Sequence, residues 1–428
     1  MVERENTLEG RTIYIPRMGE GSSRAFAAAF RAIGVNAALT PEGDERTKEL
    51  AARYTSGDEC YPERVTLGNF LKVLERDDFD PAKVAFFMPT ATGPCRLGQY
   101  APFLRRALKK MGHEDVLVLS PTSATGYREL GENVAFFRKL AWWSLLSADG
   151  LRRMLHKRRP YETVKGSTDR VYEESLVDLC EAISEANVAE KVKMARIIES
   201  LTRSVEKFQK VDADFSNPRL LVGVVGEIFC RLDTFSNESI IRKIEDYGGE
   251  AWLSDVGEWV WYTLAEVKKN LRMRGQALSK NMLKASIVWH IQRRDEHMIM
   301  APFKDELVGY EEPHDVRDVL KMSEPYLPCK GALGEMVLSV GKAIYLYGKG
   351  ADGIVDVSPF TCMNGIVCEA VYPKVSRNNG SIPIRTFYFD GTAVDLDNDV
   401  GIFMELAANY NRTKKIPRIL PGYFKQAA

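Results

Sequence analysis

Short apolar runs alternate with amphipathic stretches over the first 140 residues of the chain. The run RTIYIP is followed by a Gly-rich turn, a helix-forming Ala/Phe stretch and a second apolar run that ends at Thr40. Two more runs, KVAFFMP and DVLVLSP, each follow a stretch whose apolar residues recur at helical spacing. Because strands that alternate with helices in this way pair in parallel, residues 1–140 are predicted to form an α/β domain with a largely parallel sheet.

The strand pattern stops over residues 141–215, where the apolar residues from Met194 to Phe208 keep to one face of a long amphipathic helix. This segment is predicted to be a helical connector. Strand-like runs return as RLLVGVVGEIF, GGEAWLS, GADGIVDVSP and IPIRTFYFD. They predict a second α/β domain over residues 216–428, interrupted by a helical insertion at about 263–325 that is rich in Lys, Arg, Met and Leu. The segments FFMPTATGPCR and VDVSPFTCMNG share the order strand, Pro, loop, Cys and helix, which indicates either a duplication or a coincidence.

Charge and cysteine content narrow the classes of function. The 59 Lys and Arg residues balance the 59 Asp and Glu residues, so the total charge gives no reason to expect nucleic acid or a membrane as a partner. The N-terminus is charged where a signal peptide would be apolar, and no apolar run is long enough to span a bilayer. A cytoplasmic location is therefore expected. Seven cysteines, an odd number, indicate thiols in a reducing compartment rather than a disulfide framework.

Four cysteines are predicted to lie in loops that precede helices. Cys95 and Cys362 follow strands, and loops at the carboxyl ends of parallel strands form the ligand crevice of such sheets. Cys60 lies in SGDECYPERV, where the start of a helix favours a thiolate, and Cys329 lies in PYLPCKGALGEM. Gly-rich loops could donate N–H groups to the sulfurs of an iron–sulfur cluster. However, no C-x2-C pair is present, so idle loop thiols or small buried side chains remain an alternative interpretation.

The remaining cysteines have more ordinary interpretations. Cys180 shares a helical face with Leu176 and Ile183 and is expected in the core. Cys230 follows a strand and is interpreted as structural. Cys368 lies six residues after Cys362 in the same helix, which turns it away from Cys362 and leaves it as a reserve ligand at best.

Further candidates come from charged residues. Glu227 and Arg231 in VVGEIFCRLD follow a strand of the second domain and could face the same crevice as Cys362, as substrate-binding residues. The basic cluster from Arg152 to Arg159, in LRRMLHKRRP, is either a solvated helix end or a docking site for an acidic partner or for phosphates. The segment GEMVLSVGKA has the wrong glycine spacing for a phosphate loop, so this chain is not expected to hydrolyse ATP.

Four segments together resemble the iron–sulfur component of the 2-hydroxyacyl-CoA dehydratase and benzoyl-CoA reductase superfamily. They are GDECYPERVTLGNFL, FFMPTATGPCRLGQYAPFLRRAL, VVGEIFCRLDTFSNESIIRKIEDYGGEAWL and VSPFTCMNGIVCEAV. The similarity is greatest to the domain that occurs alone or fused behind the ATP-driven activase of that superfamily.

The resemblance implies two Rossmann-like domains around a [4Fe–4S] or double-cubane cluster, with Cys60, Cys95, Cys362 and Cys329 at the matching positions. It also implies a separate ATP-hydrolysing activase that delivers low-potential electrons, a CoA thioester or another small molecule as substrate, and an oligomeric assembly. A classical dehydratase pairs two unlike subunits and this branch is not a classical subunit, which leaves the substrate open. Two functions are therefore expected: a cluster-dependent reductase or dehydratase-like component, or a non-catalytic electron-transfer or scaffold subunit.

Overall fold

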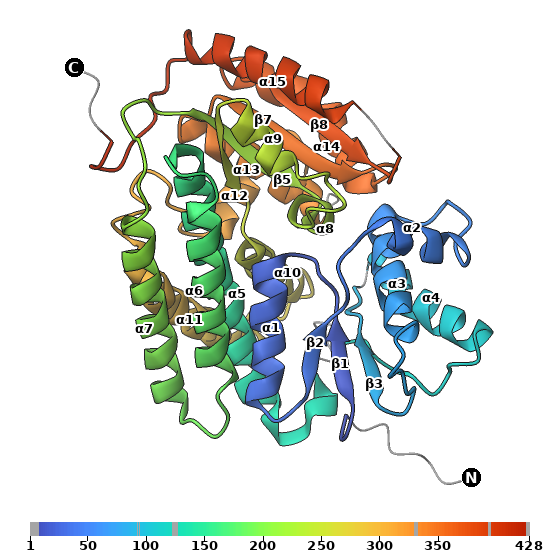
Figure 1. Ribbon diagram of the computed structural model, residues 1–428. Coiled ribbons are helices and arrows are strands. Elements are labelled where there is room, and N and C mark those ends of the chain that lie inside the picture. Colours follow the sequence, from blue (N-terminus) through green and yellow to red (C-terminus); the bar gives the residue numbers. More distant parts are fainter. Residues whose placement is uncertain are drawn as a thin grey trace.

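The computed structural model describes residues 8–91, 93, 95–121, 127–328, 333–392 and 395–424. In this part of the chain, eight strands form two parallel sheets (Figure 1). The strands of the first sheet are β1 (Thr12–Ile15), β2 (Ala37–Leu39), β3 (Val84–Phe87) and β4 (Leu117–Leu119). Those of the second sheet are β5 (Leu220–Gly226), β6 (Gly249–Leu253), β7 (Gly353–Pro359) and β8 (Ile384–Phe389).

Both sheets have the same strand order. It is β2-β1-β3-β4 in the first sheet and β6-β5-β7-β8 in the second, with every pair parallel. The prediction of an α/β fold with two parallel sheets is confirmed. In each sheet the connections reverse direction between the first strand and the third, so β1/β3 and β5/β7 flank the point where open α/β sheets bind ligands.

Helices cover both faces of each sheet, as parallel sheets require. The first sheet is accompanied by α1 (Glu20–Ala32), α2 (Glu45–Ala52), α3 (Tyr61–Leu74) and α4 (Leu97–Lys110). Three long helices then lead to the second sheet: α5 (Val134–Arg158), α6 (Ser167–Ser184) and α7 (Glu190–Gln209). The predicted boundaries at residues 140 and 216 fall within α5 and just after α7, and remain predictions.

The second sheet carries the larger set of helices. They are α8 (Ile228–Leu232), α9 (Ile240–Asp246), α10 (Val256–Met273), α11 (Lys280–Met300), α12 (Val316–Ser323), α13 (Glu335–Gly348), α14 (Met363–Asn378) and α15 (Leu396–Asn411). The predicted insertion corresponds to most of α10, together with α11 and α12. No described helix is long and apolar enough to cross a membrane.

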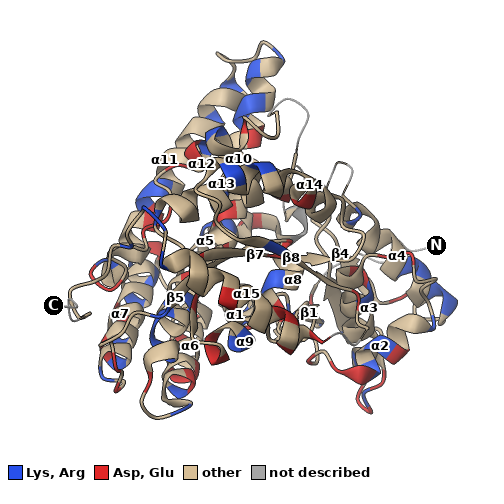
Figure 2. Cartoon of the chain, turned by 90° about the horizontal axis from the view of Figure 1, so that it is seen from above, with Lys and Arg blue, Asp and Glu red and all other residues tan. Residues whose placement is uncertain are grey.

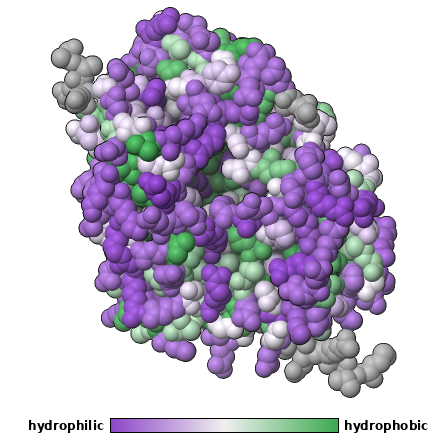
Figure 3. All heavy atoms as spheres, in the orientation of Figure 1, coloured by the Kyte–Doolittle hydropathy of each residue, from purple (hydrophilic) through white to green (hydrophobic). Residues whose placement is uncertain are grey.

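The core of the first sheet is closed by aromatic packing between α1, β3 and α5. The rings of Phe30 and Phe137 lie 4.4 Å apart, and Phe30 lies 5.8 Å from Phe87. Because α5 packs on α1, the long helices continue the layer that begins with the first sheet. The space-filling view shows a hollow near the middle of one face of the molecule, near the point where the start of α1 approaches α8 (Figure 3).

Candidate functional site

Three of the four predicted cysteine loops precede helices, and two of these three follow the carboxyl ends of strands. Cys362 follows β7 and is the N-cap of α14, and Cys95 lies between β3 and α4. Since β3 and β7 hold the same position in their sheets, these two loops are equivalent in the two halves of the molecule. Cys60 is the N-cap of α3, in the connection from β2 to β3.

The Arg96 side chain ties these three loops together. Its guanidinium donates one hydrogen bond of 2.7 Å to the carbonyl of Asp58, two residues before Cys60. It also donates to the carbonyl and the hydroxyl of Thr361, both at 2.9 Å, directly before Cys362. Arg96 itself adjoins Cys95. One side chain therefore brings together the loops of all three cysteines, across the boundary between the two sheets.

Thr361 has a strained backbone, with φ of +64°. A β-branched residue rarely adopts this left-handed conformation, which costs on the order of 1 to 3 kcal/mol and persists only where its surroundings enforce it. The two hydrogen bonds from Arg96 hold Thr361 in this conformation. The strain sets the direction in which the next residue, Cys362, leaves the loop.

The charge of Glu227 acts on all three thiols. It raises the pKa of Cys60, of Cys95 and of Cys362, although burial is the larger cause for each of them. Glu227 therefore lies within electrostatic reach of each of the three thiols. Cys60 and Cys362 are buried, whereas Cys95 is exposed.

The expectation that the helix start would favour a Cys60 thiolate is wrong. Burial, followed by the charge of Glu227, raises the pKa of the Cys60 thiol to about 12. Removal of the thiol from water outweighs the partial positive charge at the helix end. A metal would have to displace protons from these thiols, which makes its binding dependent on pH.

Backbone N–H groups point at two of the sulfurs. A hydrogen bond from the Leu97 amide lowers the pKa of Cys95, and one from the Gly365 amide lowers that of Cys362. A Cβ atom at Gly365 would lie 2.7 Å from the Ser358 side chain, so only glycine lets the start of α14 approach β7 this closely. N–H donors of this kind stabilise a negatively charged cluster through its sulfurs.

Cys329 lies outside the described residues. The start of α13, which follows it, lies beside the same group of loops. The Glu335 carboxylate accepts a hydrogen bond of 2.7 Å from the amide of Ile228, the neighbour of Glu227. Gly334 lies next to the Asn364 side chain, two residues after Cys362.

Glu227 and Arg231, predicted to bind substrate, do lie on the side of the second sheet that faces the thiols. Glu227 accepts hydrogen bonds from the amides of Phe229 (3.1 Å) and Cys230 (2.8 Å), and so caps α8. Arg231 is buried and donates to the carbonyl of Gly226 at 2.5 Å. Its Nε atom is buried and has no partner among the described residues.

Sequence reasoning missed three residues of this group. Glu335 is buried, and desolvation together with the charge of Glu227 raises its pKa to about 8. The Oδ1 atom of Asn364 is buried without a partner among the described residues. The thiol of Cys230 is fully buried, and the charges of Glu227, Cys60 and Cys362 act on its pKa. No motif or spacing marks these residues, because they join the group only through the packing of the second sheet.

The donor chemistry fits an iron–sulfur cluster. Thiols are the ligands that iron–sulfur clusters use, and the N–H donors and orphaned polar atoms around them suit a charged, partly desolvated group. Within the described residues, no three His, Cys, Asp or Glu side chains are arranged to hold a single metal ion.

The other two cysteines, Cys368 and Cys180, pack against apolar parts of the structure. Cys368 is buried, and its thiol lies 3.6 Å from the carbonyl of Met336. Cys180 is partly buried and packs against the core that contains Leu176 and Ile183.

The basic cluster from Arg152 to Arg159 is neither a solvated helix end nor a docking surface. Arg153, Lys157 and Arg159 are buried. Arg159 pairs with Glu245 at 2.7 Å, and Arg152 pairs with Asp255 at 3.0 Å. Glu245 and Asp255 lie far away in sequence, so these ion pairs join the end of α5 to the second sheet. Most of the cluster is therefore not exposed for contact with another protein.

Lys157 gives this cluster a measurable dependence on pH. Its ammonium has no hydrogen-bond partner among the described residues and lies 4.5 Å from the centre of the Tyr310 ring. Burial lowers its pKa from 10.5 to about 7. The unfolded chain therefore takes up this proton at higher pH than the folded chain does.

We expect the free energy of unfolding to fall as the pH decreases from about 10 to about 7, by up to about 1.4 kcal/mol per pH unit from this group. Lys157→Met should remove that slope and raise stability at pH 7. Urea denaturation of both proteins at several pH values measures the difference. If the free energy of unfolding depends on pH in the same way for both proteins, the lowered pKa of Lys157 is contradicted.

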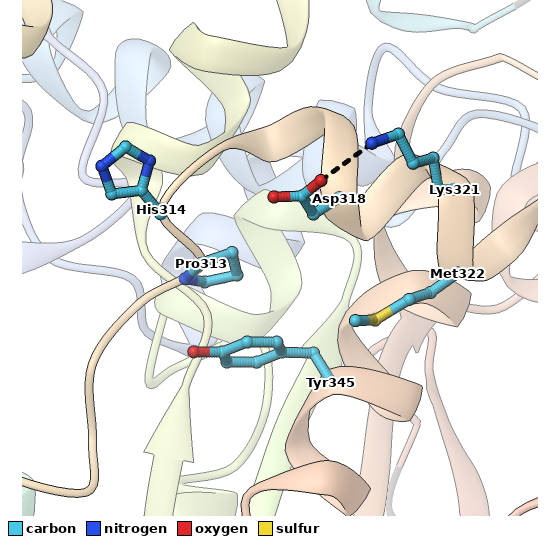
Figure 4. A pocket seen from close by; sticks show the side chains of 6 residues that line it. All are labelled: Pro313, His314, Asp318, Lys321, Met322 and Tyr345. Carbon is cyan, nitrogen blue, oxygen red and sulfur yellow. Dashed lines mark hydrogen bonds and ion pairs between the residues drawn. The ribbon is translucent and has the colours of Figure 1, made fainter.

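A surface pocket beside α12 and α13 contains none of the predicted site residues. It is open, has a volume of about 540 Å³ and is lined by Pro313, His314, Asp318, Lys321, Met322 and Tyr345 (Figure 4). An ion pair of 3.1 Å joins Lys321 to Asp318 at its rim. The pocket therefore lies apart from the cysteine loops, beside α12 and α13.

The Arg96 bridge can be tested directly. Arg96→Ala should weaken the link between the cysteine loops by on the order of 1 to 2 kcal/mol. If the predicted cluster is bound, its iron should be released several-fold faster to a chelator. Arg105→Ala is the matched control, because Arg105 lies on the same helix and donates to Val118 within the first sheet. Equal rates of iron release in the two variants would show that the bridge does not hold the loops.

The described structure thus belongs to the class of parallel α/β proteins with two sheets and thiol-bearing loops at their facing edges. Models of known protein families do not match this chain, and no curated protein matches it significantly.

Proposed function

We propose that this chain is an iron–sulfur protein of the 2-hydroxyacyl-CoA dehydratase type. It accepts low-potential electrons from a separate ATP-hydrolysing activase and reduces or radicalises a bound substrate, which is a CoA thioester or another small molecule. The observation that carries the proposal is the Arg96 bridge, which gathers the loops of Cys60, Cys95 and Cys362 from both sheets. Three thiols at the facing edges of two parallel sheets suit a group held between two domains.

The residues of the chain have separate roles in this proposal. Cys60, Cys95 and Cys362 bind the cluster, Cys329 is the candidate for a fourth ligand, and the amides of Leu97 and Gly365 donate to its sulfurs. A bound [4Fe–4S] or double-cubane cluster would supply single electrons at low potential. Binding requires that the thiols lose their protons, which burial otherwise retains.

Two buried residues beside the thiols, Glu335 and Arg231, favour an enzyme over a non-catalytic subunit. Because its pKa is about 8, Glu335 is largely protonated at neutral pH and can donate a hydrogen bond to a substrate oxygen. Arg231 provides a fixed positive charge that stabilises negative charge on a reduced substrate. Both residues are buried, so they act in a medium that strengthens such interactions.

One observation favours the alternative, a non-catalytic electron-transfer subunit. Cys230 contributes a further thiol to the same group. If Cys230 or Cys329 completes the ligand set, no iron is left open for substrate.

The test is anaerobic purification, with iron and acid-labile sulfide determined per chain, followed by EPR. We expect iron and sulfide in equal amounts, and a reduced EPR signal that forms only with ATP and the activase. Purified chain without sulfide would contradict the proposal. Reduction by ATP and this chain alone would contradict the need for an activase. A change of the EPR signal on addition of a CoA thioester supports the enzyme, whereas its absence in both wild type and Cys230→Ala supports the accessory subunit.

The free thiols of the described cysteines support the proposal of a reducing, cytoplasmic compartment.

A further inference from the structure

A helical hairpin stands out from the body of the molecule. It consists of α10 and α11, and Figure 2 shows it projecting past the other helices of the second half, with Lys and Arg on both arms. Its base is fixed by stacked tryptophans: Trp261 lies 5.6 Å from Trp142 of α5 and 4.9 Å from Trp289 of α11. The hairpin is therefore anchored at its base and free at its tip.

The tip is strongly basic. Residues 267–294 contain eight Lys and Arg residues and no Asp or Glu, and three of the eight, Lys269, Arg293 and Arg294, pair with acidic residues just outside this range. Arg274, Lys280 and Lys284 around the turn are exposed, and none of them has an ion pair in the described structure. The balanced charge of the whole chain, which predicted no membrane partner, averages over this local excess.

Large aliphatic side chains project from the same end of the hairpin. Leu278 in the turn is fully exposed, and Met273, Leu283 and Ile287 are each at least half exposed. Exposed apolar residues that cluster within one short segment indicate a surface that is covered by a protein partner, a ligand or a membrane. Here they are surrounded by cations.

We propose that the tip of the α10–α11 hairpin docks on an anionic lipid bilayer. Leu278 and Met273 insert at the level of the headgroups, and Arg274, Lys280 and Lys284 bind the phosphates. An apolar tip with a basic collar is the arrangement by which peripheral helices bind the negatively charged cytoplasmic leaflet. No described helix can span the bilayer, so the contact is peripheral.

The same features disfavour other occupants. A second copy would bring two hairpins of equal positive charge together. Aromatic residues are enriched in protein interfaces, as are Met and Arg, whereas Lys is depleted. Residues 272–288 contain no Tyr, Trp or Phe, and Trp261 and Trp289 are buried.

The test is co-sedimentation of the whole chain with vesicles, either of phosphatidylcholine alone or of phosphatidylcholine and phosphatidylglycerol in equal parts. We expect binding to the anionic vesicles only, with loss of binding at high salt. Lys280→Gln with Lys284→Gln should weaken binding about 25-fold, at about fivefold for each charge. Leu278→Gln should weaken it about tenfold or more.

Matched controls come from exposed residues elsewhere. Lys109→Gln with Lys110→Gln removes two exposed charges at the end of α4, and Leu406→Gln removes an exposed leucine of α15. Both should bind vesicles like the unaltered chain. The proposal is overturned if the chain binds neither kind of vesicle or binds both equally. It is also overturned if the control substitutions weaken vesicle binding as much as the tip substitutions do, or if the chain uses these lysines to bind nucleic acid and does not bind vesicles. Because iron content plays no part in this assay, its result is independent of the proposed function.

Discussion

Replacement of Cys362 by serine, and separately of Cys95 by serine, is expected to remove most of the iron from anaerobically purified protein. A hydroxyl is a far poorer ligand than a thiolate for the soft iron–sulfur unit, and each thiol lies in one of the loops that Arg96 ties together. Iron and acid-labile sulfide per chain, with the EPR signal of the reduced protein, measure the loss. Full iron occupancy in both variants would contradict the cluster.

Two other cysteines provide the controls. Cys180→Ala and Cys368→Ser alter thiols that pack against the core. They should keep the iron content of the unaltered protein and cost on the order of 1 kcal/mol in stability. Loss of iron in either variant would show that iron retention reports general stability rather than ligation.

The strands could be predicted from the sequence because their signal is local. Each of the eight apolar runs became a strand, and in β5 and β7 nearly every residue is buried, as expected for parallel strands that are covered on both faces. The conclusion that GEMVLSVGKA is not a phosphate loop also agrees with the structure. Lys342 of GEMVLSVGKA lies inside α13, where no loop exists to hold a phosphate.

The buried charges could not be predicted, because their partners come from distant segments. The cluster LRRMLHKRRP is indistinguishable in sequence from a solvated helix end. Its burial depends on Glu245 and Asp255, more than 80 residues further along the chain. The expectation that Cys60 would favour the thiolate was wrong for the same reason. A helix start is visible in the sequence, whereas the burial of the thiol, which outweighs it, is not.

The candidate site lies between these two cases. The loops of Cys95 and Cys362 were predicted from strand ends and that of Cys60 from a polar segment before a helix, and hydrogen bonds from Arg96 join the three loops. Arg96, which holds them, carries no signal beyond its position next to Cys95. Glu335 and Cys230 join only because α8 and α13 pack against each other at the end of β5.

Replacement of Lys342 by methionine is expected to lower the free energy of unfolding by about 3 to 5 kcal/mol. The Lys342 ammonium is fully buried, pairs with Glu312 and lies 4.0 Å from Glu258. Methionine keeps most of the volume but removes the ammonium from both carboxylates, which leaves Glu312 with only Arg153, at 3.9 Å, as an ion-pair partner in the described structure. Urea denaturation under anaerobic conditions measures the change.

The matched control is Lys349→Met, near the end of the same helix, where the ion pair with Glu311 is partly exposed and should contribute less than about 1 kcal/mol. The double variant Lys342→Met with Glu312→Gln should regain much of the lost stability, because the carboxylate that Lys342 pairs with most closely is then neutral. Trp252, which donates a hydrogen bond of 2.8 Å to Glu312, can donate equally to the amide oxygen. If Lys342→Met costs no more than Lys349→Met, the buried pair does not stabilise the fold, and the junction between α13 and the Glu312 loop is held by apolar packing alone.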